Sequence, residues 1–223
     1  MKQNLDRNNM HYDPLATETT RRRYERNARF YDRMESSAEM RHAPWRKKLW
    51  ALVKGLKTLE VGVGTGKNLP YYPENTEITA IDLTPGMLDR AQTRAQALDN
   101  PVNLRLGDVQ KLEFPTGAFD TVVATFVFCS VPNPILGLQE IRRVLKPGGT
   151  VLLLEHVRSE NPFLGSIMDW LNPIVVRIMG ANINRRTVDN VQRSGLEIVK
   201  VENLDGGGIF KLITACRPQE NGA

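Results

Sequence analysis

Short apolar segments alternate with helix-like segments over the middle of this 223-residue chain, and this alternation restricts its fold more than any other feature. The expected strands are 58–61, 78–81, 102–106, 119–126 and 150–155, and the expected helices between them are 85–98 and 134–145. The run at 119–126 is apolar enough to be buried on both faces, as central parallel strands are. Strands that alternate with helices at this spacing are joined by right-handed crossovers. The pattern therefore predicts an α/β fold with a doubly wound, mostly parallel sheet.

The last third of the chain follows a different pattern. Two strand-like segments, 196–201 and 209–216, are too close in sequence for a crossover helix, so we expect them to be antiparallel neighbours. A helix is expected at 185–194. The segment 161–180 is strongly apolar, but charged residues and an Asn-Pro pair interrupt it, so it does not fit a membrane span. It is expected to form either a pair of core helices or an apolar lid over a site.

Positive charge is concentrated in the first quarter of the chain. The net charge is +5, and residues 1–55 carry the whole excess. Helical spacing of apolar residues predicts one helix over 17–34 and a second over 44–54. A basic amphipathic helix can contact an anionic membrane, and it can equally be a solvated helix face. We expect residues 1–55 to form a helical cap on a domain of residues 56–223, with the apolar lid inserted at about 160–182.

Composition excludes several classes of protein. Two cysteines, Cys129 and Cys216, cannot form a disulfide framework or a cysteine-rich metal site. The three histidines lack the spacing of metal ligands, so no metal is expected. The first residues have no apolar core of a signal peptide. A soluble, cytoplasmic protein is the expectation.

A glycine-rich loop after the first expected strand carries the strongest functional signal. Glu60 ends the strand, and Gly62, Gly64 and Gly66 follow at G-x-G-x-G spacing, which lets the backbone turn tightly and approach a ligand. Asp82 ends the next strand, where a carboxylate can bind the two hydroxyls of a ribose. Neither the dinucleotide spacing nor a phosphate-binding loop is present. An adenosine whose tail is an amino acid fits best, with Glu60 as a partner for its ammonium group, directly or through water.

This loop is one of five motifs by which the chain resembles the class I S-adenosylmethionine-dependent methyltransferases, methyltransferase type 11. The motifs are 59–66, 81–87, 106–109, 119–123 and 143–149. The resemblance implies a three-layer Rossmann-like sandwich with a seven-stranded, mostly parallel sheet whose last strand is antiparallel. It also implies S-adenosyl-L-methionine as the cofactor and S-adenosyl-L-homocysteine as the product.

The resemblance also implies roles for single residues. The glycine loop holds the methionine part of the cofactor, Asp82 the ribose and Asp108 the adenine amino group. Thr125 and Phe126 border the transferred methyl group. The cofactor-binding residues implied in this way are Tyr31, Glu60, Gly62, Gly64, Gly66, Asp82, Leu83, Met87, Asp108, Val109, Thr125 and Phe126. The helical cap of residues 1–55 would fold over the cofactor, and Tyr31 is also a candidate for catalysis.

Within that family, the chain resembles two branches most. Residues 30–32 and 130–134 are similar to quinone-methylating and bacterial phospholipid N-methylating enzymes. Residues 128–131, 155–157 and 180–186 are similar to membrane-associated thiol methyltransferases. Both branches act on lipid-like or apolar acceptors. The resemblance therefore favours phosphatidylethanolamine N-methylation or quinone-ring C-methylation, with small-thiol S-methylation as the alternative.

Three residues outside the cofactor motifs are candidates for work on the acceptor. His156 follows the fifth expected strand, where it can act as a general base or acceptor ligand, or simply end the strand. Arg185 and Arg186 can bind an acceptor phosphate, or begin a solvated helix. Nucleic-acid or protein methylation is a further alternative, but no nucleic-acid partner is expected because no RNA-binding module is appended. The sequence leaves the oligomeric state open.

Overall fold

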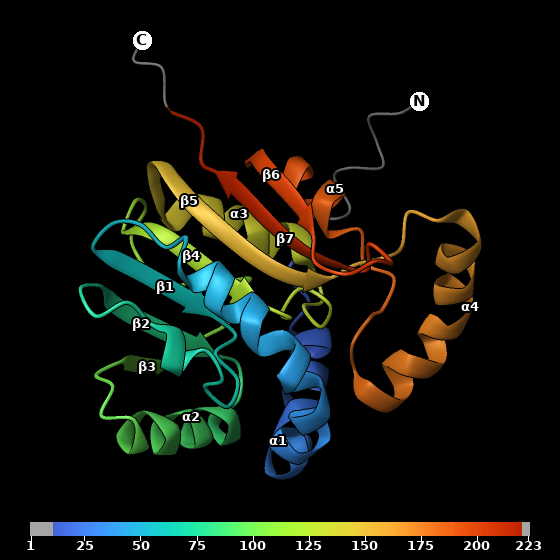
Figure 1. Ribbon diagram of the computed structural model, residues 1–223, viewed down its shortest axis with the longest axis horizontal. Coiled ribbons are helices and arrows are strands. Elements are labelled where there is room, and N and C mark those ends of the chain that lie inside the picture. The colour runs from blue at the N-terminus through green and yellow to red at the C-terminus, as the bar shows by residue number, and fades with distance from the viewer. Residues whose placement is uncertain (1–10, 220–223) are drawn as a thin grey trace.

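The computed structural model describes residues 11–219, apart from the side chains of residue 29, residues 34–37 and residues 178–179. In this part of the chain one sheet is covered by helices on both faces (Figure 1). The strands are β1 (Lys57–Val61), β2 (Glu77–Asp82), β3 (Asn103–Leu106), β4 (Phe119–Thr125), β5 (Leu145–His156), β6 (Glu197–Asn203) and β7 (Phe210–Cys216). The α-helices are α1 (Pro14–Trp50), α2 (Pro85–Ala97), α3 (Pro134–Val144), α4 (Pro162–Met179) and α5 (Thr187–Arg193), and a short 3-10 helix spans Leu69–Tyr71.

The order of the strands confirms the predicted fold class. The sheet runs β3-β2-β1-β4-β5-β7-β6. Neighbours from β3 to β5 are parallel, whereas β7 is antiparallel to both β5 and β6. From β1 the chain adds β2 and β3 on one side and then β4 and β5 on the other, so the order of strands reverses between β1 and β4. Sheets of this kind bind ligands in the crevice beyond the carboxyl ends of the strands at that point. The topology thus places a binding site next to the glycine-rich loop.

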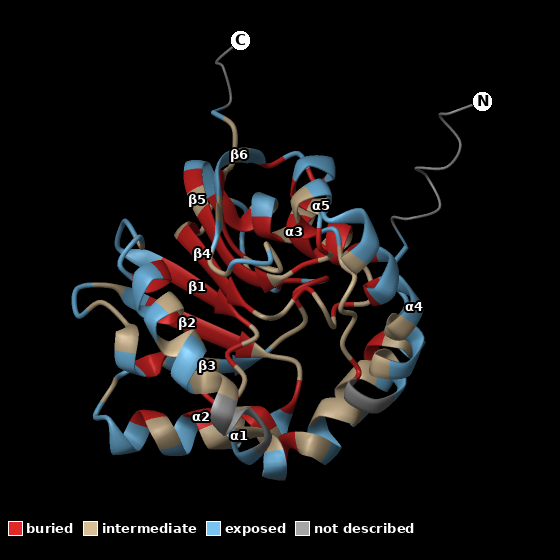
Figure 2. Ribbon diagram, turned by 45° about the vertical axis from the view of Figure 1, so that its right-hand side comes forward, coloured by how far each residue is buried: buried red, intermediate tan, exposed pale blue. Residues whose placement is uncertain are grey.

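Two helical layers bury the sheet. α3 and α5 cover one face, where Leu138, Ile141 and Val191 pack into the largest apolar cluster. α2 and the second half of α1 cover the other face, and Leu49 and Trp50 of α1 are buried there against β4, β5 and β7. Figure 2 shows the strands as largely buried and the outer sides of the helices as exposed. This packing gives the carboxyl edge of the sheet a rigid support.

The prediction of two N-terminal helices was wrong, because α1 is one helix of 37 residues. Asp13 caps its start by accepting hydrogen bonds from the backbone N–H groups of Leu15 and Ala16. Pro44, expected to begin the second helix, lies inside the element. A proline inside a helix removes one backbone hydrogen bond and costs about 3 kcal/mol. Burial of Leu49 and Trp50 after it offsets this cost, so the chain stays helical through the proline.

Two other segments differ from the sequence expectation. β5 begins at Leu145, which pairs with Phe119, and not at residue 150, because a register shift between Phe119 and Thr121 accommodates the Pro-Gly-Gly segment. The apolar segment 161–180 forms one helix, which excludes the pair of core helices. Asn161 caps α4, and Gly180 ends it in the left-handed conformation. None of the helices within residues 11–219 combines the length and apolarity needed to cross a membrane.

Candidate active site

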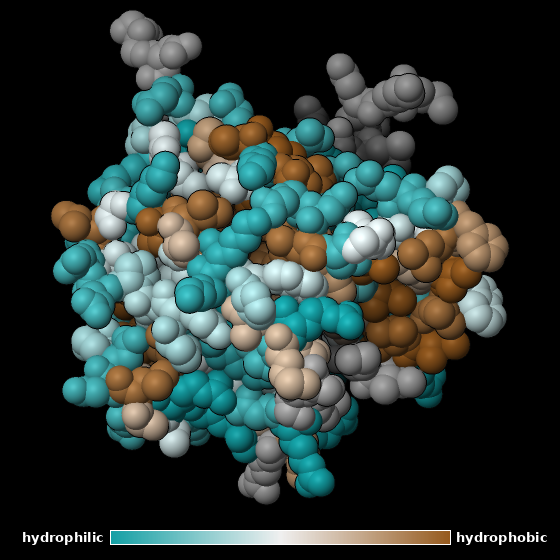
Figure 3. Space-filling view, in the orientation of Figure 1, coloured by the Kyte–Doolittle hydropathy of each residue, from teal (hydrophilic) through white to brown (hydrophobic). Residues whose placement is uncertain are grey.

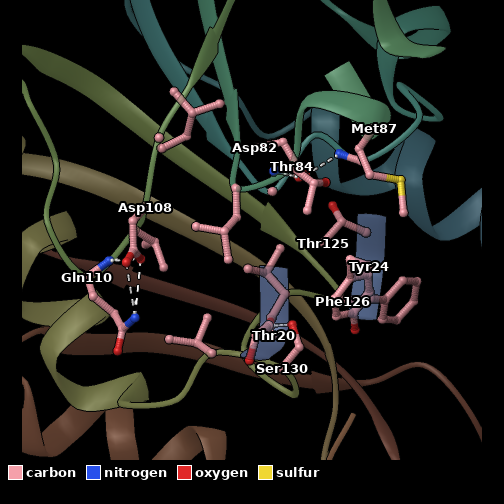
Figure 4. Close-up of a pocket in the computed structure, with 18 of the residues that line it drawn as sticks. Thr20, Tyr24, Asp82, Thr84, Met87, Asp108, Gln110, Thr125, Phe126 and Ser130 are labelled. Atoms are coloured by element: carbon pink, nitrogen blue, oxygen red, sulfur yellow. Dashed lines mark hydrogen bonds between the residues drawn. The ribbon is translucent and has the colours of Figure 1, made fainter. Parts of the chain in front are cut away.

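A cavity lies beyond the carboxyl ends of β1, β2 and β4 and is covered by the N-terminal half of α1. Figure 4 shows Asp108 and Gln110 at one end of it, and Thr125 and Phe126 at the other. The lining residues are Thr20, Tyr24, Tyr31, Gly62, Gly64, Ile81, Asp82, Leu83, Thr84, Met87, Gly107, Asp108, Val109, Gln110, Thr125, Phe126, Val127, Ser130, Val131 and Pro132. The structure therefore brings together ten of the twelve predicted cofactor residues. Glu60 and Gly66 are not among those lining the cavity.

The glycine loop needs its glycines for two different reasons. Gly62, Gly64 and Gly66 all have positive φ angles, of 69°, 57° and 80°. A Cβ on Gly62 would collide with Val127, and one on Gly66 would press on the side chain of Leu69. A Cβ on Gly64 would meet nothing within 4 Å. Gly62 and Gly66 thus permit close packing inside the protein, whereas Gly64 leaves open space at the cavity.

Asp82 connects the glycine loop to the end of β2. Its Oδ2 accepts a hydrogen bond from the Gly64 backbone N–H at 2.9 Å. Its Oδ1 accepts from the backbone N–H and the hydroxyl of Thr84, at 2.9 and 2.8 Å. Burial raises the pKa of the carboxyl, and these donors oppose the shift. Oδ1 already accepts two hydrogen bonds, whereas Oδ2 accepts one and has a further lone pair, so Asp82 can still accept a hydrogen bond from a ligand in the cavity.

A second carboxylate, Asp108, is oriented at the other end of the cavity. Its Oδ1 accepts a hydrogen bond from the backbone N–H of Gln110 at 2.9 Å. The Gln110 amide also donates to Thr17 of α1 at 3.1 Å, and its oxygen accepts from the Asn133 N–H. Val109 and Met87 provide buried apolar surface nearby. Gln110 therefore connects this end of the cavity to the covering helix and to the start of α3.

A strained residue, Phe126, directly follows the end of β4 at the cavity. Phe126 has a φ of 58°, a conformation that bulky residues rarely adopt and that is common at functional sites. Its N–H donates to the Leu154 carbonyl at 2.8 Å, which holds the turn in place. The Phe126 ring lies 4.6 Å from the His42 ring and 6.1 Å from Phe210, measured between centroids. The strained turn thus faces the cavity on one side and joins an aromatic cluster on the other.

Two buried glutamates support the strand ends from behind. Glu60 is fully buried and accepts hydrogen bonds from Asn68, at 2.5 Å, and from the Tyr72 hydroxyl. Glu155 is fully buried and accepts from the backbone N–H groups of Val127 and Phe128, at 3.0 and 3.1 Å. Burial raises the pKa of each carboxyl to about 7. Glu60 does not line the cavity, and its observed hydrogen-bond partners are the protein groups of Asn68 and Tyr72.

The predicted acceptor residues are distributed differently. Tyr31 lines the cavity, and its ring centroid is 6.4 Å from that of Tyr24. His156 does not line it; its ring packs edge-on against Phe210 at 5.2 Å, and burial lowers the pKa of its imidazole. Arg186 is exposed, with Asp189 3.9 Å away. Of the four predicted residues Tyr31, His156, Arg185 and Arg186, Tyr31 is the one that lines the cavity.

Arg185 borders the cavity from the outside. Its Nη2 donates to the carbonyl of Val131, a lining residue, at 2.9 Å. Its Nε is buried without a hydrogen-bond partner, and no carboxylate of residues 11–219 forms an ion pair with it. Burial lowers the pKa of this guanidinium. A second cavity, of about 280 Å³, lies on its other side and is lined also by Arg158, Arg186 and Lys211.

Several lining residues had no predicted role. Thr84 lies within the motif 81–87, two residues after Asp82, so its contact with Asp82 was within reach of sequence reasoning. Gln110 and Thr20 had no such signal, because their positions depend on how α1 folds back over the sheet. Ser130 was noted only as part of a branch motif. No group of three or more potential metal-ligating side chains occurs among the residues that the structure describes.

Comparison with known proteins identifies the family. The methyltransferase domain model matches residues 59–153. The chain is 33% identical over 172 residues to a phosphatidylethanolamine N-methyltransferase of Cereibacter sphaeroides, covering 72% of this chain and 79% of the relative. It is 34% identical to a demethylmenaquinone methyltransferase of Staphylococcus aureus, over 67% of this chain and 65% of the relative. It is 30% identical to a thiol S-methyltransferase of Rattus norvegicus, over 78% of this chain and 73% of the relative. The chain therefore belongs to the class I S-adenosylmethionine-dependent methyltransferases.

A solved structure supports the fold independently. An S-adenosylmethionine-dependent methyltransferase from Methanosarcina mazei superposes with a TM-score of 0.62 at 21% identity, covering 76% of this chain and 95% of that one. At this identity the likeness concerns the fold alone. Fold, family and enzyme class thus agree with the sequence prediction, and the chain is a methyltransferase that uses S-adenosylmethionine.

Proposed function

We propose that this enzyme transfers a methyl group from S-adenosylmethionine to the amino group of phosphatidylethanolamine. The observation that carries the choice of acceptor is Arg185, a largely buried guanidinium without a carboxylate partner. A buried charge without a partner is costly, and a guanidinium is well suited to phosphate oxygens. Among the three acceptor types known for the relatives, the phospholipid is the one that carries a phosphate. The relative from Cereibacter sphaeroides supports the same choice.

Two carboxylates at separate positions in the cavity support binding of the cofactor there. Asp82 Oδ2 offers a free lone pair next to the open space at Gly64, which suits a ribose hydroxyl, and Asp108 lies at the far end, which suits an amino-substituted ring. We place the adenine beside Val109, Leu83 and Met87, and the methionine part along the glycine loop. When bound, the cofactor supplies a methyl group on a positively charged sulfur. The protein's own work is then to position the acceptor and to exclude water.

The acceptor is proposed to enter past Phe126. Thr125 and Phe126 would border the transferred methyl group, and Tyr31 of α1 would cover it. An amine must be deprotonated before it attacks. His156 packs against Phe210 and does not line the cavity, so we propose that it accepts this proton through an intervening water molecule. We also propose that Arg186 contributes to phosphate binding, and that the basic N-terminal helix holds the enzyme at an anionic membrane surface.

Substitution of Arg185 tests this proposal. In Arg185→Gln, we expect the KM for phosphatidylethanolamine in mixed micelles to rise at least tenfold, because a charge-assisted contact to phosphate is lost. The cofactor Kd, measured by calorimetry, should change less than twofold. Arg185→Lys should recover part of the loss. The matched control is Arg142→Gln, an exposed arginine of α3. An unchanged KM in Arg185→Gln, with an unchanged melting temperature, would contradict the proposal that Arg185 binds the phosphate of the acceptor.

A further inference from the structure

α4 presents an apolar stripe to solvent. The exposed fractions of Phe163, Trp170 and Ile174 are 77%, 74% and 53%, and Ile167 is also exposed. These positions are spaced by four, three and four residues, which places them on one face of the helix. Figure 3 shows the resulting hydrophobic patch over α4 at the edge of the molecule. An exposed patch of large apolar side chains marks an interaction surface.

The opposite face of α4 fastens the helix to the body of the protein. Met168 is buried, and its sulfur accepts a hydrogen bond from the Ser159 N–H. The Asp169 carboxylate accepts hydrogen bonds from Nε and Nη2 of Arg158, at 2.9–3.1 Å. Asn172 accepts from the Ile183 N–H at 2.9 Å. The stripe is thus not a core face left uncovered, because the helix already packs through its other side.

Positive charge borders the stripe at its C-terminal end. Arg177 is exposed and lies one turn after Ile174, beside the stripe. Arg23 of α1 lies next to Gly180 at the end of α4. Arg22, which pairs with Glu18, and Arg26, one turn further along α1, are exposed. The single acidic residue of α4, Asp169, lies on the opposite face and is paired. Large aromatic and aliphatic side chains flanked by arginines are typical of helices that lie in the interface of anionic membranes.

We propose that α4 is a membrane-docking helix whose face of Phe163, Ile167, Trp170 and Ile174 enters the headgroup region of an anionic bilayer. The residues after α4 connect this face to the active site, because the Asn182 N–H donates to the Cys129 carbonyl, next to Ser130 of the cavity. Docking would bring the cavity to the lipid surface. The inference goes beyond the proposed function, because it concerns binding and does not depend on which acceptor is methylated.

Vesicle flotation without cofactor tests docking apart from catalysis. Vesicles of phosphatidylcholine and phosphatidylglycerol at 70:30 contain no methyl acceptor of the proposed kind, and they should float the full chain. The combined variant Phe163→Gln, Trp170→Gln, Ile174→Gln should bind at least tenfold more weakly. The matched control is the combined variant Leu56→Gln, Leu98→Gln, Val199→Gln. The three wild-type residues have exposed fractions of 72%, 45% and 66%, similar to those of the stripe, but they lie outside α4. The control should float like the wild type.

Tryptophan emission provides a second readout. Trp50 is fully buried and Trp45 half-buried, so a blue shift on adding vesicles should come from Trp170 and disappear in Trp170→Phe. Circular dichroism verifies that each variant is folded. Equal flotation of the stripe variant and the wild type would overturn the proposal. So would conversion of a dimer to a monomer by the stripe variant without an effect on flotation, because the stripe would then be a subunit interface.

Discussion

Asp82→Ala is expected to weaken S-adenosylmethionine binding at least tenfold. The substitution removes the carboxylate proposed to hold the ribose hydroxyls, and hydrogen bonds to a charged group contribute about 1.5–3 kcal/mol. It also leaves the N–H of Gly64 without its acceptor, so the glycine loop loses the bond that connects it to β2. The measurement is the cofactor Kd by calorimetry, together with the melting temperature without cofactor.

A matched control separates binding from folding. Asp120 is also a structural aspartate, which accepts hydrogen bonds from the backbone N–H groups of Leu56 and Lys57 outside the cavity. Asp120→Ala is expected to lower the melting temperature and to leave the cofactor Kd within twofold. An unchanged Kd in a folded Asp82→Ala would refute the assignment of the ribose site.

Stability is expected to fall as the pH rises from about 4.5 to about 7. Glu60 and Glu155 have pKa values raised by burial from 4.5 to about 7. In this window the unfolded chain has released these protons while the folded protein still binds them, so a rising pH favours unfolding. A shift of this size corresponds to a loss on the order of 3 kcal/mol for each group, complete above pH 7.

Glu155→Gln isolates this effect, because glutamine imitates the protonated acid and can still accept the two N–H groups of Val127 and Phe128. Near pH 4.5 the variant should be about as stable as the wild type in urea unfolding. At pH 8 it should be more stable by about 2–3 kcal/mol. A constant difference between the two proteins from pH 4.5 to 8 would contradict the raised pKa of Glu155.

Local sequence signals predicted the parts of the site that are contiguous in the chain. The glycine loop, Asp82 and Asp108 each lie at or just after the carboxyl end of a strand, so the strand order alone brings them to one edge of the sheet. Thr20 and Gln110 escaped prediction because Thr20 reaches the cavity, and Gln110 its partner Thr17, only when α1 folds over the sheet. Glu60 belongs to the motif 59–66, but its carboxylate accepts hydrogen bonds from Asn68 and Tyr72 and does not line the cavity.

The helices were predicted less well where tertiary packing overrides local preference. Pro44 is a strong local signal for a helix start, but burial of the residues that follow keeps α1 continuous. The apolar composition of 161–180 led to the expectation of a core helix pair or a lid, whereas the segment forms the single helix α4, and composition does not tell on which side a helix is covered. The structure shows that its polar side, at Asp169 and Asn172, contacts the protein.

Transfer of the labelled methyl group to a defined acceptor tests the central claim most directly. The purified enzyme would be given methyl-labelled S-adenosylmethionine with phosphatidylethanolamine vesicles, a demethylated quinone or an alkyl thiol, in separate reactions. We predict label in the amino headgroup of the phospholipid, with an equal amount of S-adenosylhomocysteine formed. Label in the quinone or the thiol, and none in the phospholipid, would contradict the proposed acceptor.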